Sequence, residues 1–264
     1  MKRFLPLAAA SLLLLAPGAA RAIDHDNIDG GRPLRFEDAD SIAFRERAFE
    51  FGIAPTWPRG SDFGLGLSAE YLWGFALNSH VSLDFDPSLG GRAGSDDTRA
   101  DLGRVGVGVF HNFNRETLGT PSFAVRADAY LPTGRGTRGV DFRLRGIMSR
   151  TIRGNERLHV NLDGEFRTDP EEGGRSFVPA VAVGYSRPVG YPRRFDRTAL
   201  AEVTWRGGEG GEGGSGGVLS VGAGLRQQVT VRSVFDVGIQ SDVAAARGAA
   251  RDDLRLVAGY STAF

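Results

Sequence analysis

The chain has 264 residues, with 32 basic side chains balanced by 32 acidic ones, and no cysteine. The lack of cysteine excludes a disulfide framework and thiolate chemistry. The balanced charge excludes the broad basic field of a nucleic-acid-binding protein, so we expect no nucleic-acid partner. A helical membrane protein is also excluded, because no stretch reaches the roughly 18 unbroken apolar residues that a spanning helix needs.

The first 22 residues have the pattern of a secretory signal peptide. A basic start precedes the mostly apolar run 4–16, and residues 20–22 (Ala-Arg-Ala) have the small-x-small spacing of a signal-peptidase site. The apolar run is too short to cross a membrane as a helix. We therefore predict a signal peptide over residues 1–22 that is cleaved after Ala22, rather than a short N-terminal anchor. Export also excludes a cytoplasmic enzyme.

Residues 23–46 are polar and show no strand alternation, so we predict a periplasmic segment that precedes the first strand. Its apolar residues include Leu34, Phe36, Ile42 and Phe44. They could form a short helix that plugs the periplasmic mouth of a barrel. The segment could equally be a disordered leader, and the sequence leaves both interpretations open.

From residue 47 onwards, apolar and polar residues alternate with a period of two. In residues 158–167 every even position is apolar or glycine and every odd position is polar. A strand sends such alternate residues to opposite faces, whereas a helix would mix them around its circumference. Turn signals separate successive runs. The pattern predicts twelve strands, at residues 47–57, 62–74, 79–87, 101–113, 121–132, 139–151, 157–168, 176–187, 196–206, 218–229, 232–243 and 252–264.

The length of these strands favours a membrane barrel over a soluble one. Most are longer than the about 5–6 residues of a globular strand and reach the about 9–11 residues of a membrane-spanning one. Aromatic residues gather near strand ends, as in the interfacial girdles of outer-membrane barrels. The predicted fold is all-β, a single 12-stranded antiparallel transmembrane β-barrel of the outer-membrane type over residues 47–264.

The last strand carries a pattern of its own. The chain ends on Phe264, and Tyr260 lies on the same face of the predicted strand. This ending resembles the signal by which bacterial barrels are recognised for insertion. We therefore predict contact of the C-terminal strand with the barrel-assembly machinery, contact of the barrel with outer-membrane lipid and lipopolysaccharide, and localisation in the outer membrane of a Gram-negative bacterium.

The polar face of the strands is expected to line the lumen. In an open lumen its charges would create a transverse field that selects solutes, whereas in a collapsed one they would pair and stabilise the barrel. Twelve strands fall between the about eight that fill and the roughly 16 that conduct water, which predicts a narrow or partly occluded pore. The candidate solute path comprises Glu50, Glu70, Asp84, Asp86, Arg104, Arg126, Asp128, Arg143, Arg145, His159, Asp163, Glu165, Arg167, Glu202, Arg226, Asp236 and Arg255.

Other motifs do not predict catalysis. The glycine-rich stretch 207–217 contains G-x-G-x-x-G, but no helix is expected to follow it, so we interpret it as a flexible external loop. The acidic residues near Asp24 lack the spacing of a calcium loop. His159 shares a strand face with Asp163, but no serine is evidently poised beside it and no G-x-S-x-G occurs. No catalytic residue, metal or cofactor is predicted.

Several short motifs suggest a relationship. RPLRFEDAD (32–40) precedes the first strand, LPTG (131–134) ends the fifth, LHVNL (158–162) lies in the seventh, and VAGY (257–260) lies near the end. In this order they resemble the family labelled as the MetA-pathway of phenol degradation, outer-membrane barrels regarded as transporters. The resemblance implies a channel for small solutes such as hydrophobic or aromatic compounds, and it carries over no catalytic residue.

The predicted function is therefore an outer-membrane channel or transporter for small solutes, with selectivity set by the arginines and carboxylates of the lumen. One alternative is a closed outer-membrane barrel with a structural or surface-loop binding role, which would not conduct. A less favoured one is a membrane-embedded hydrolase, for which His159→Ala should abolish lipid hydrolysis.

Overall fold

The computed structural model describes residues 24–60, 63–90, 100–134, 138–211, 214, 216–246 and 249–264. The predicted signal peptide, residues 1–22, lies outside these ranges. Within them, no helix combines the length and the hydropathy that crossing a membrane requires.

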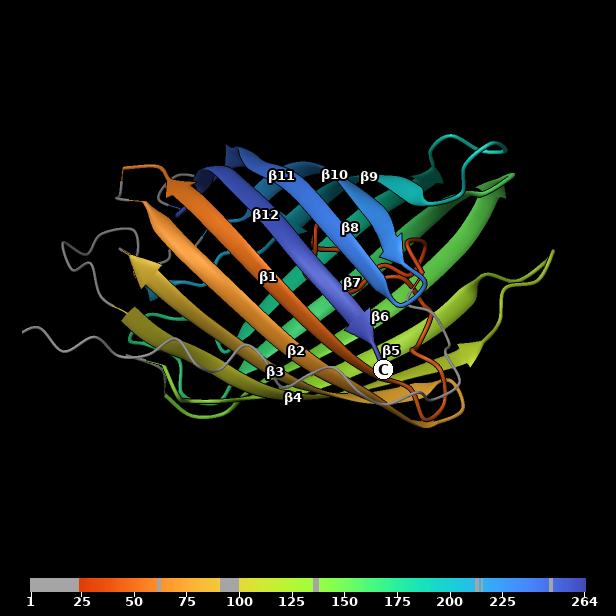
Figure 1. The fold of residues 1–264 in the computed structure, drawn as a ribbon. Helices are drawn as coiled ribbons and strands as arrows, with labels where there is room; N and C mark the ends of the chain where they lie inside the picture. Colours follow the sequence, from red (N-terminus) through yellow and green to blue (C-terminus); the bar gives the residue numbers. More distant parts are fainter. Residues whose placement is uncertain are drawn as a thin grey trace, which may run out of the picture.

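Twelve antiparallel strands form one closed barrel, in which each strand pairs with its neighbours in sequence and the last strand pairs with the first (Figure 1). The predicted fold is thus confirmed. The largest difference from the predicted strand ends is in the third strand, which continues to Gly90. The strands are β1 (Arg47–Pro58), β2 (Gly64–Ala76), β3 (Ser79–Gly90), β4 (Ala100–Asn114), β5 (Ser122–Leu131), β6 (Asp141–Arg153), β7 (Glu156–Arg167), β8 (Phe177–Pro188), β9 (Arg197–Arg206), β10 (Val218–Thr230), β11 (Ser233–Ala245) and β12 (Asp252–Ala263).

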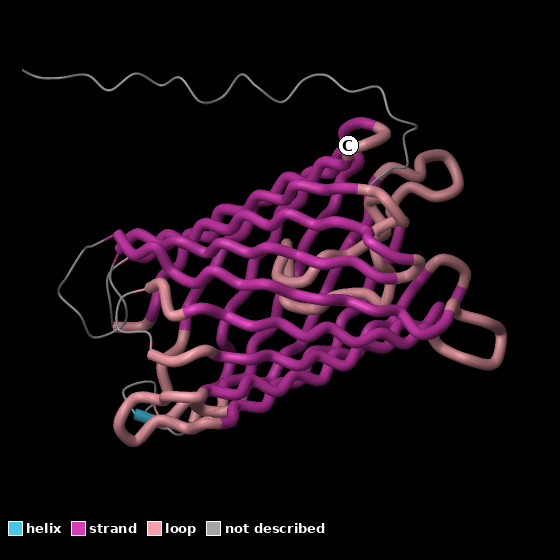
Figure 2. The backbone as a smooth tube through the Cα atoms, turned by 90° about the horizontal axis from the view of Figure 1, so that it is seen from below, coloured by secondary structure: helices cyan, strands magenta, loops and turns pink. Residues whose placement is uncertain are grey.

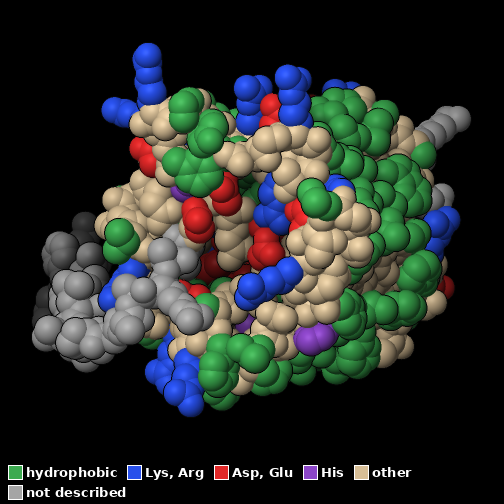
Figure 3. Space-filling model, turned by 90° about the vertical axis from the view of Figure 1, so that its right-hand side faces the viewer, with side chains coloured by type: hydrophobic (Ala, Val, Ile, Leu, Met, Phe, Trp, Pro, Cys, Tyr) green, Lys and Arg blue, Asp and Glu red, His purple; other side chains and the backbone are tan. Residues whose placement is uncertain are grey.

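The two faces of the barrel differ as the alternation requires. Large apolar side chains such as Leu83, Leu144 and Leu162 are exposed on the outside, whereas their polar neighbours in sequence face inward. Figure 3 looks at the end of the barrel that carries the C-terminus. Hydrophobic side chains cover the outer wall there, and acidic and basic side chains line a hollow in the middle. An apolar outer surface of this kind suits hydrocarbon rather than water.

The residues that precede β1 lie inside the barrel. We call residues 24–46 the inner segment; its trace runs through the half of the lumen nearer the C-terminus and is enclosed by strands (Figures 1 and 2). Ile28, Leu34, Phe36 and Ala39 of this segment are fully buried. The apolar core of the molecule therefore lies between the inner segment and the inside of the wall.

Residues 24–46 contain turns and bends but no helix, so the expected helical form is wrong, whereas the segment does enter the barrel as the plug alternative expected. The reason is visible in its backbone. The amides of Arg35 and Phe36 donate to the carboxylate of Glu202, and the amide of Ala39 donates to the Ser149 hydroxyl. These donors would otherwise serve an α-helical ladder, and Pro33 supplies no amide hydrogen at all.

Candidate functional site: the lumen and the inner segment

Glycines in the wall make room for the inner segment. An added Cβ at Gly184 of β8 would lie 2.3 Å from the Phe36 ring, and one at Gly222 of β10 would lie 2.9 Å from Leu34. On β11, a Cβ at Gly238 would lie 2.6 Å from the Pro33 carbonyl oxygen. Real Cβ atoms do not come this close, so the wall is shaped to accept the segment.

Ion pairs attach the inner segment to β1 and β10, which lie three positions apart around the barrel. Arg32 pairs with Glu50 of β1 and donates to the Phe51 carbonyl at 2.8 Å. Asp29 accepts from Arg226 of β10 at 2.8 Å. The wall residues Glu50 and Arg226 are nearly fully buried, and an unpaired charge at such a position would cost several kcal/mol. Each pair therefore favours the docked position of the segment.

Glu37 makes the connection nearest the middle of the lumen. One carboxylate oxygen lies 3.3 Å from Nη1 of Arg126 on β5, and the other lies 3.1 Å from Nη1 of Arg145 on β6. The Glu37 amide donates to Asn161 Oδ1 at 2.7 Å, and Asn161 Nδ2 donates back to the Glu37 carbonyl at 2.9 Å. Side chain and backbone of Glu37 are thus both fixed by the wall.

Arg126 also joins three carboxylates of the wall. It lies 3.0 Å from Glu70, 3.3 Å from Asp84 and 2.8 Å from Asp128. Arg143 shares Asp128 at 2.8 Å. The carboxylates of β2, β3 and β5 and the arginines of β5 and β6 therefore meet in one network.

A second network lies toward the opposite end of the lumen. Arg206 and Arg167 both pair with Glu165 and with Glu209, which follows β9 in the glycine-rich stretch. Burial alone would raise the pKa of Glu209, but the two arginines lower it to about 2. Residues 212, 213 and 215 of the predicted flexible loop lie outside the described residues, but Glu209 is bound to the wall.

His159 has hydroxyl partners that the sequence did not reveal. Its Nδ1 lies 2.9 Å from the Ser149 hydroxyl and its Nε2 lies 3.0 Å from that of Ser186, so the expectation that no serine lies beside it is wrong. These serines come from neighbouring strands, which sequence spacing could not align. His159 is fully buried with its ring 5.1 Å from that of Phe36, and both ring nitrogens are occupied by hydroxyls rather than an orienting carboxylate. His159 therefore packs against Phe36 of the inner segment, and Ser149 accepts a hydrogen bond from the Ala39 amide.

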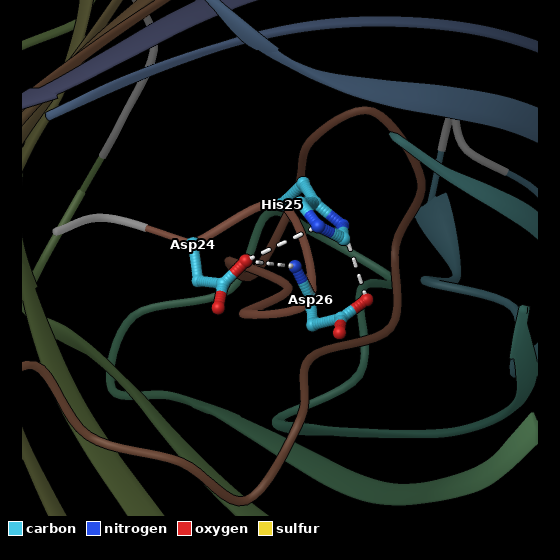
Figure 4. Close-up of side chains that lie close together, drawn as sticks. All are labelled: Asp24, His25 and Asp26. Carbon is cyan, nitrogen blue, oxygen red and sulfur yellow. Dashed lines mark hydrogen bonds and ion pairs between the residues drawn. The ribbon is translucent and has the colours of Figure 1, made fainter. Parts of the chain in front are cut away.

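At the start of the described chain, His25 lies between two carboxylates (Figure 4). Its Nδ1 is 3.2 Å from Asp26, and its Nε2 is 3.5 Å from Asp24. Ligand atoms of the three residues come within 4.8 Å of one another. However, the two carboxylates approach different ring nitrogens, and these nitrogens also contact the Thr198 hydroxyl at 2.8 Å and the Phe195 carbonyl at 3.1 Å. The arrangement is a hydrogen-bonded anchor for the inner segment.

None of the seventeen residues of the predicted solute path is exposed. Pairs that the register places opposite each other include Asp86 with Arg104 and Arg226 with Asp236. Arg255 of β12 lies 3.4 Å from the Gln240 amide oxygen. The sequence did not identify Glu37 as a partner of the wall, although a charged residue within a segment that precedes a barrel was a signal.

The space between the inner segment and the wall near Arg126 is small. A cavity of about 10 Å³ lies between Ile28, Glu37, Glu70, His80 and Arg126. Its volume is about that needed by a single water molecule. With the segment docked, this part of the lumen is filled.

Comparison with known proteins extends the description of the fold. No family model matches the chain, and no curated protein matches it either. Among solved structures, it is similar to the COG4313 outer membrane channel from Pseudomonas putida F1, with a TM-score of 0.65 and 10% identity over 86% of this chain and 98% of that one. It is also similar to the NanC porin, with a TM-score of 0.56 and 10% identity over 80% of this chain and 98% of that one. At this identity the likeness shows a shared barrel fold.

Proposed function

We propose that this protein is an outer-membrane channel for small solutes that the inner segment closes. The observation that carries the proposal is the fit between Phe36 and the wall at Gly184. A barrel stabilised by its own ion pairs needs no such space. A segment that must dock and undock needs a complementary surface to return to.

The bonding of the inner segment suits reversible closure. Besides the apolar contacts of residues such as Phe36, it is held by hydrogen bonds and by ion pairs such as Arg32–Glu50 and Asp29–Arg226, which water and ions can replace. Its C-terminal end continues into the barrel where β1 begins at Arg47. Withdrawal toward the C-terminal end of the barrel would expose a charged passage without breaking the sheet.

Placement in the outer membrane of a Gram-negative bacterium belongs to the same proposal. It is supported by the signal-peptide pattern of residues 1–22, the apolar outer wall and the barrels that this fold resembles. Outer-membrane lipid and lipopolysaccharide would contact the wall, and the assembly machinery would read Tyr260 and Phe264. Membership of the MetA-pathway of phenol degradation family rests on the four short motifs and remains part of the proposal.

The lumen favours polar solutes over the hydrophobic or aromatic compounds that the family resemblance implies. Its inner face carries the ion pairs of Arg126, Arg143 and Arg145. An apolar solute gains nothing from such a surface, whereas a polar or charged one is oriented by it.

The test is single-channel recording of the refolded mature chain in a planar bilayer under a salt gradient. We expect rare discrete openings from a silent baseline, with a reversal potential away from zero because the lumen charges select ions. Permanent silence from a barrel shown to be folded by its heat-modifiable gel mobility would overturn the channel. It would instead favour the alternative of a closed barrel with a structural or surface-loop binding role.

A further inference from the structure

Two arginines face each other inside the wall. Arg126 of β5 and Arg145 of β6 are direct cross-strand partners, and both are nearly fully buried. Like charges directly opposite each other destabilise a sheet, and a buried cation without a counter-charge is costlier still. Each arginine has a carboxylate of its own in the wall, Asp128 for Arg126 and Asp163 for Arg145, and an anion between the two would offset their mutual repulsion.

Glu37 supplies that anion from the inner segment. Each of its carboxylate oxygens contacts the Nη1 atom of a different arginine, at 3.3 Å for Arg126 and 3.1 Å for Arg145. One carboxylate thus bridges the pair. Glu37 lies on the inner segment and not on the wall, so both arginines lose this contact when the segment undocks.

The wall holds the two arginines in place without Glu37. Nε of Arg126 donates to Asp128 at 2.8 Å, and Nε of Arg145 donates to Asp163 at 2.7 Å. These bonds fix each guanidinium so that its Nη1 points at the bridging position. A site of this kind is preorganised, which reduces the cost of binding a ligand there.

We propose that Arg126 and Arg145 form a subsite for the carboxylate of a small organic acid, and that Glu37 is an internal stand-in for it. The inference rests on the proposed channel function and gives it a solute class. A single carboxylate would replace Glu37 charge for charge, so it leaves the balance with Glu70 and Asp84 unchanged. An organic acid that binds the pair competes with Glu37 and so favours the undocked inner segment.

The test uses trypsin cleavage after Arg35 as a measure of undocking, in sodium acetate and in sodium chloride at equal ionic strength. In the wild-type chain, acetate competes with Glu37, and we expect faster cleavage than in chloride. In full-length Glu37→Ala the bridging position is vacant. Acetate can then bind the arginine pair whether the segment is docked or undocked, so the acceleration by acetate should be lost.

Loss of the acetate effect in Glu37→Ala separates binding at the arginine pair from a general salt effect, which would change the cleavage rates of both chains in the same direction. The double variant Glu37→Ala/Arg145→Gln is the matched control and should show no difference between the two salts. Equal rates in acetate and chloride for both wild type and Glu37→Ala would overturn the subsite. The wild-type arm needs no substitution and remains informative if Glu37→Ala refolds poorly.

Proteolysis does not depend on conduction, so the two proposals can fail separately. An acetate effect in the wild type that is lost in Glu37→Ala, together with a silent bilayer, would support the subsite and overturn the channel. Discrete openings together with no acetate effect in the wild type would support the channel and overturn the subsite.

Discussion

His25 shows at the scale of one residue how protonation bears on the inner segment. Its ring nitrogens face the Thr198 hydroxyl and the Phe195 carbonyl, and the Thr198 hydroxyl also lies 2.6 Å from Asp26, to which it donates. Burial alone would lower the pKa of His25, but Asp26 and Asp24 raise it above its ordinary 6.5. Burial alone would raise the pKa of Asp26, but His25 and Thr198 lower it below its ordinary 3.8.

We therefore expect docking of the inner segment to weaken as the pH rises. A raised histidine pKa contributes docking free energy fully below pH 6.5, and this contribution is lost as the pH rises through the raised value. The contribution of Asp26 is present above pH 3.8 and is lost as the pH falls through its lowered value. The combined contribution of His25 and Asp26 to docking is therefore largest between these two limits.

The measurement is the rate of cleavage after Arg35 from pH 6 to 9, normalised to a peptide substrate. Burial also raises the pKa of Asp38, which adds a slope of the same sign. His25→Gln keeps the Asp38 contribution and removes that of His25, so its slope should be shallower. Superimposable profiles for wild type and His25→Gln would contradict the assignment.

Gly184 allows a second test at this scale. In Gly184→Ala the new Cβ would overlap the Phe36 ring, and overpacking of this kind costs about 1–3 kcal/mol. Cleavage after Arg35 should accelerate by roughly 5- to 150-fold, the factor that this free energy represents. Gly146→Ala in β6 is the matched control, because a Cβ there meets nothing within 4 Å. Equal rates for the two variants would mean that Phe36 does not need the space.

At the scale of strands, register decides which charges meet. The alternation predicted the inward face of β5, β6 and β7, but not that Arg126 pairs with Arg145 or that Arg145 pairs with Asp163. Those pairs depend on turn lengths and bulges. The route of the inner segment was less predictable still. It has no periodicity, and its bonds join residues 124 positions apart, as between Glu37 and Asn161.

The ion pairs of Arg126 should contribute more to the free energy of unfolding than a single exposed ion pair at the rim of the barrel. Arg126→Gln leaves Glu70, Asp84 and Asp128 without their shared cation, and we expect a loss of about 3–5 kcal/mol in the free energy of unfolding. Arg59→Gln breaks an exposed pair with Asp253, and should cost at most about 1 kcal/mol. Urea unfolding from lipid vesicles measures both. Similar losses would show that the Arg126 network is already hydrated.

The last strand offers a test of assembly. Phe264 stacks against Phe49 of β1 with ring centroids 6.4 Å apart, where the barrel closes. Phe264→Ala should reduce the folded fraction in cells, because both the closing contact and the predicted insertion signal are weakened. Phe113→Ala, at the exposed end of β4, is the control for loss of one interfacial aromatic. Heat-modifiable gel mobility measures the folded fraction, and equal fractions would contradict a special role for Phe264.

At the scale of the whole molecule, twelve strands enclose more space than their own side chains fill. The inner segment occupies that space with Phe36, Leu34 and Glu37, while glycines on three strands make room for it. The sequence predicted the closed sheet, its outer face and the charged lining, because these follow from a period of two. It left open whether the segment enters the lumen, because that depends on contacts between distant residues. We propose that the position of the inner segment determines whether the barrel conducts.

A disulfide staple tests this claim most directly. The natural chain has no cysteine, and the Ala39 amide lies 2.9 Å from the Ser149 hydroxyl, so Ala39→Cys/Ser149→Cys introduces one cysteine on the segment and one beside it on β6. Mass spectrometry before recording verifies that the disulfide between them has formed. Planar-bilayer recordings of the same barrel should be silent when the staple is oxidised and should show discrete openings after a reductant is added. Equal conductance in both states would contradict closure by the inner segment.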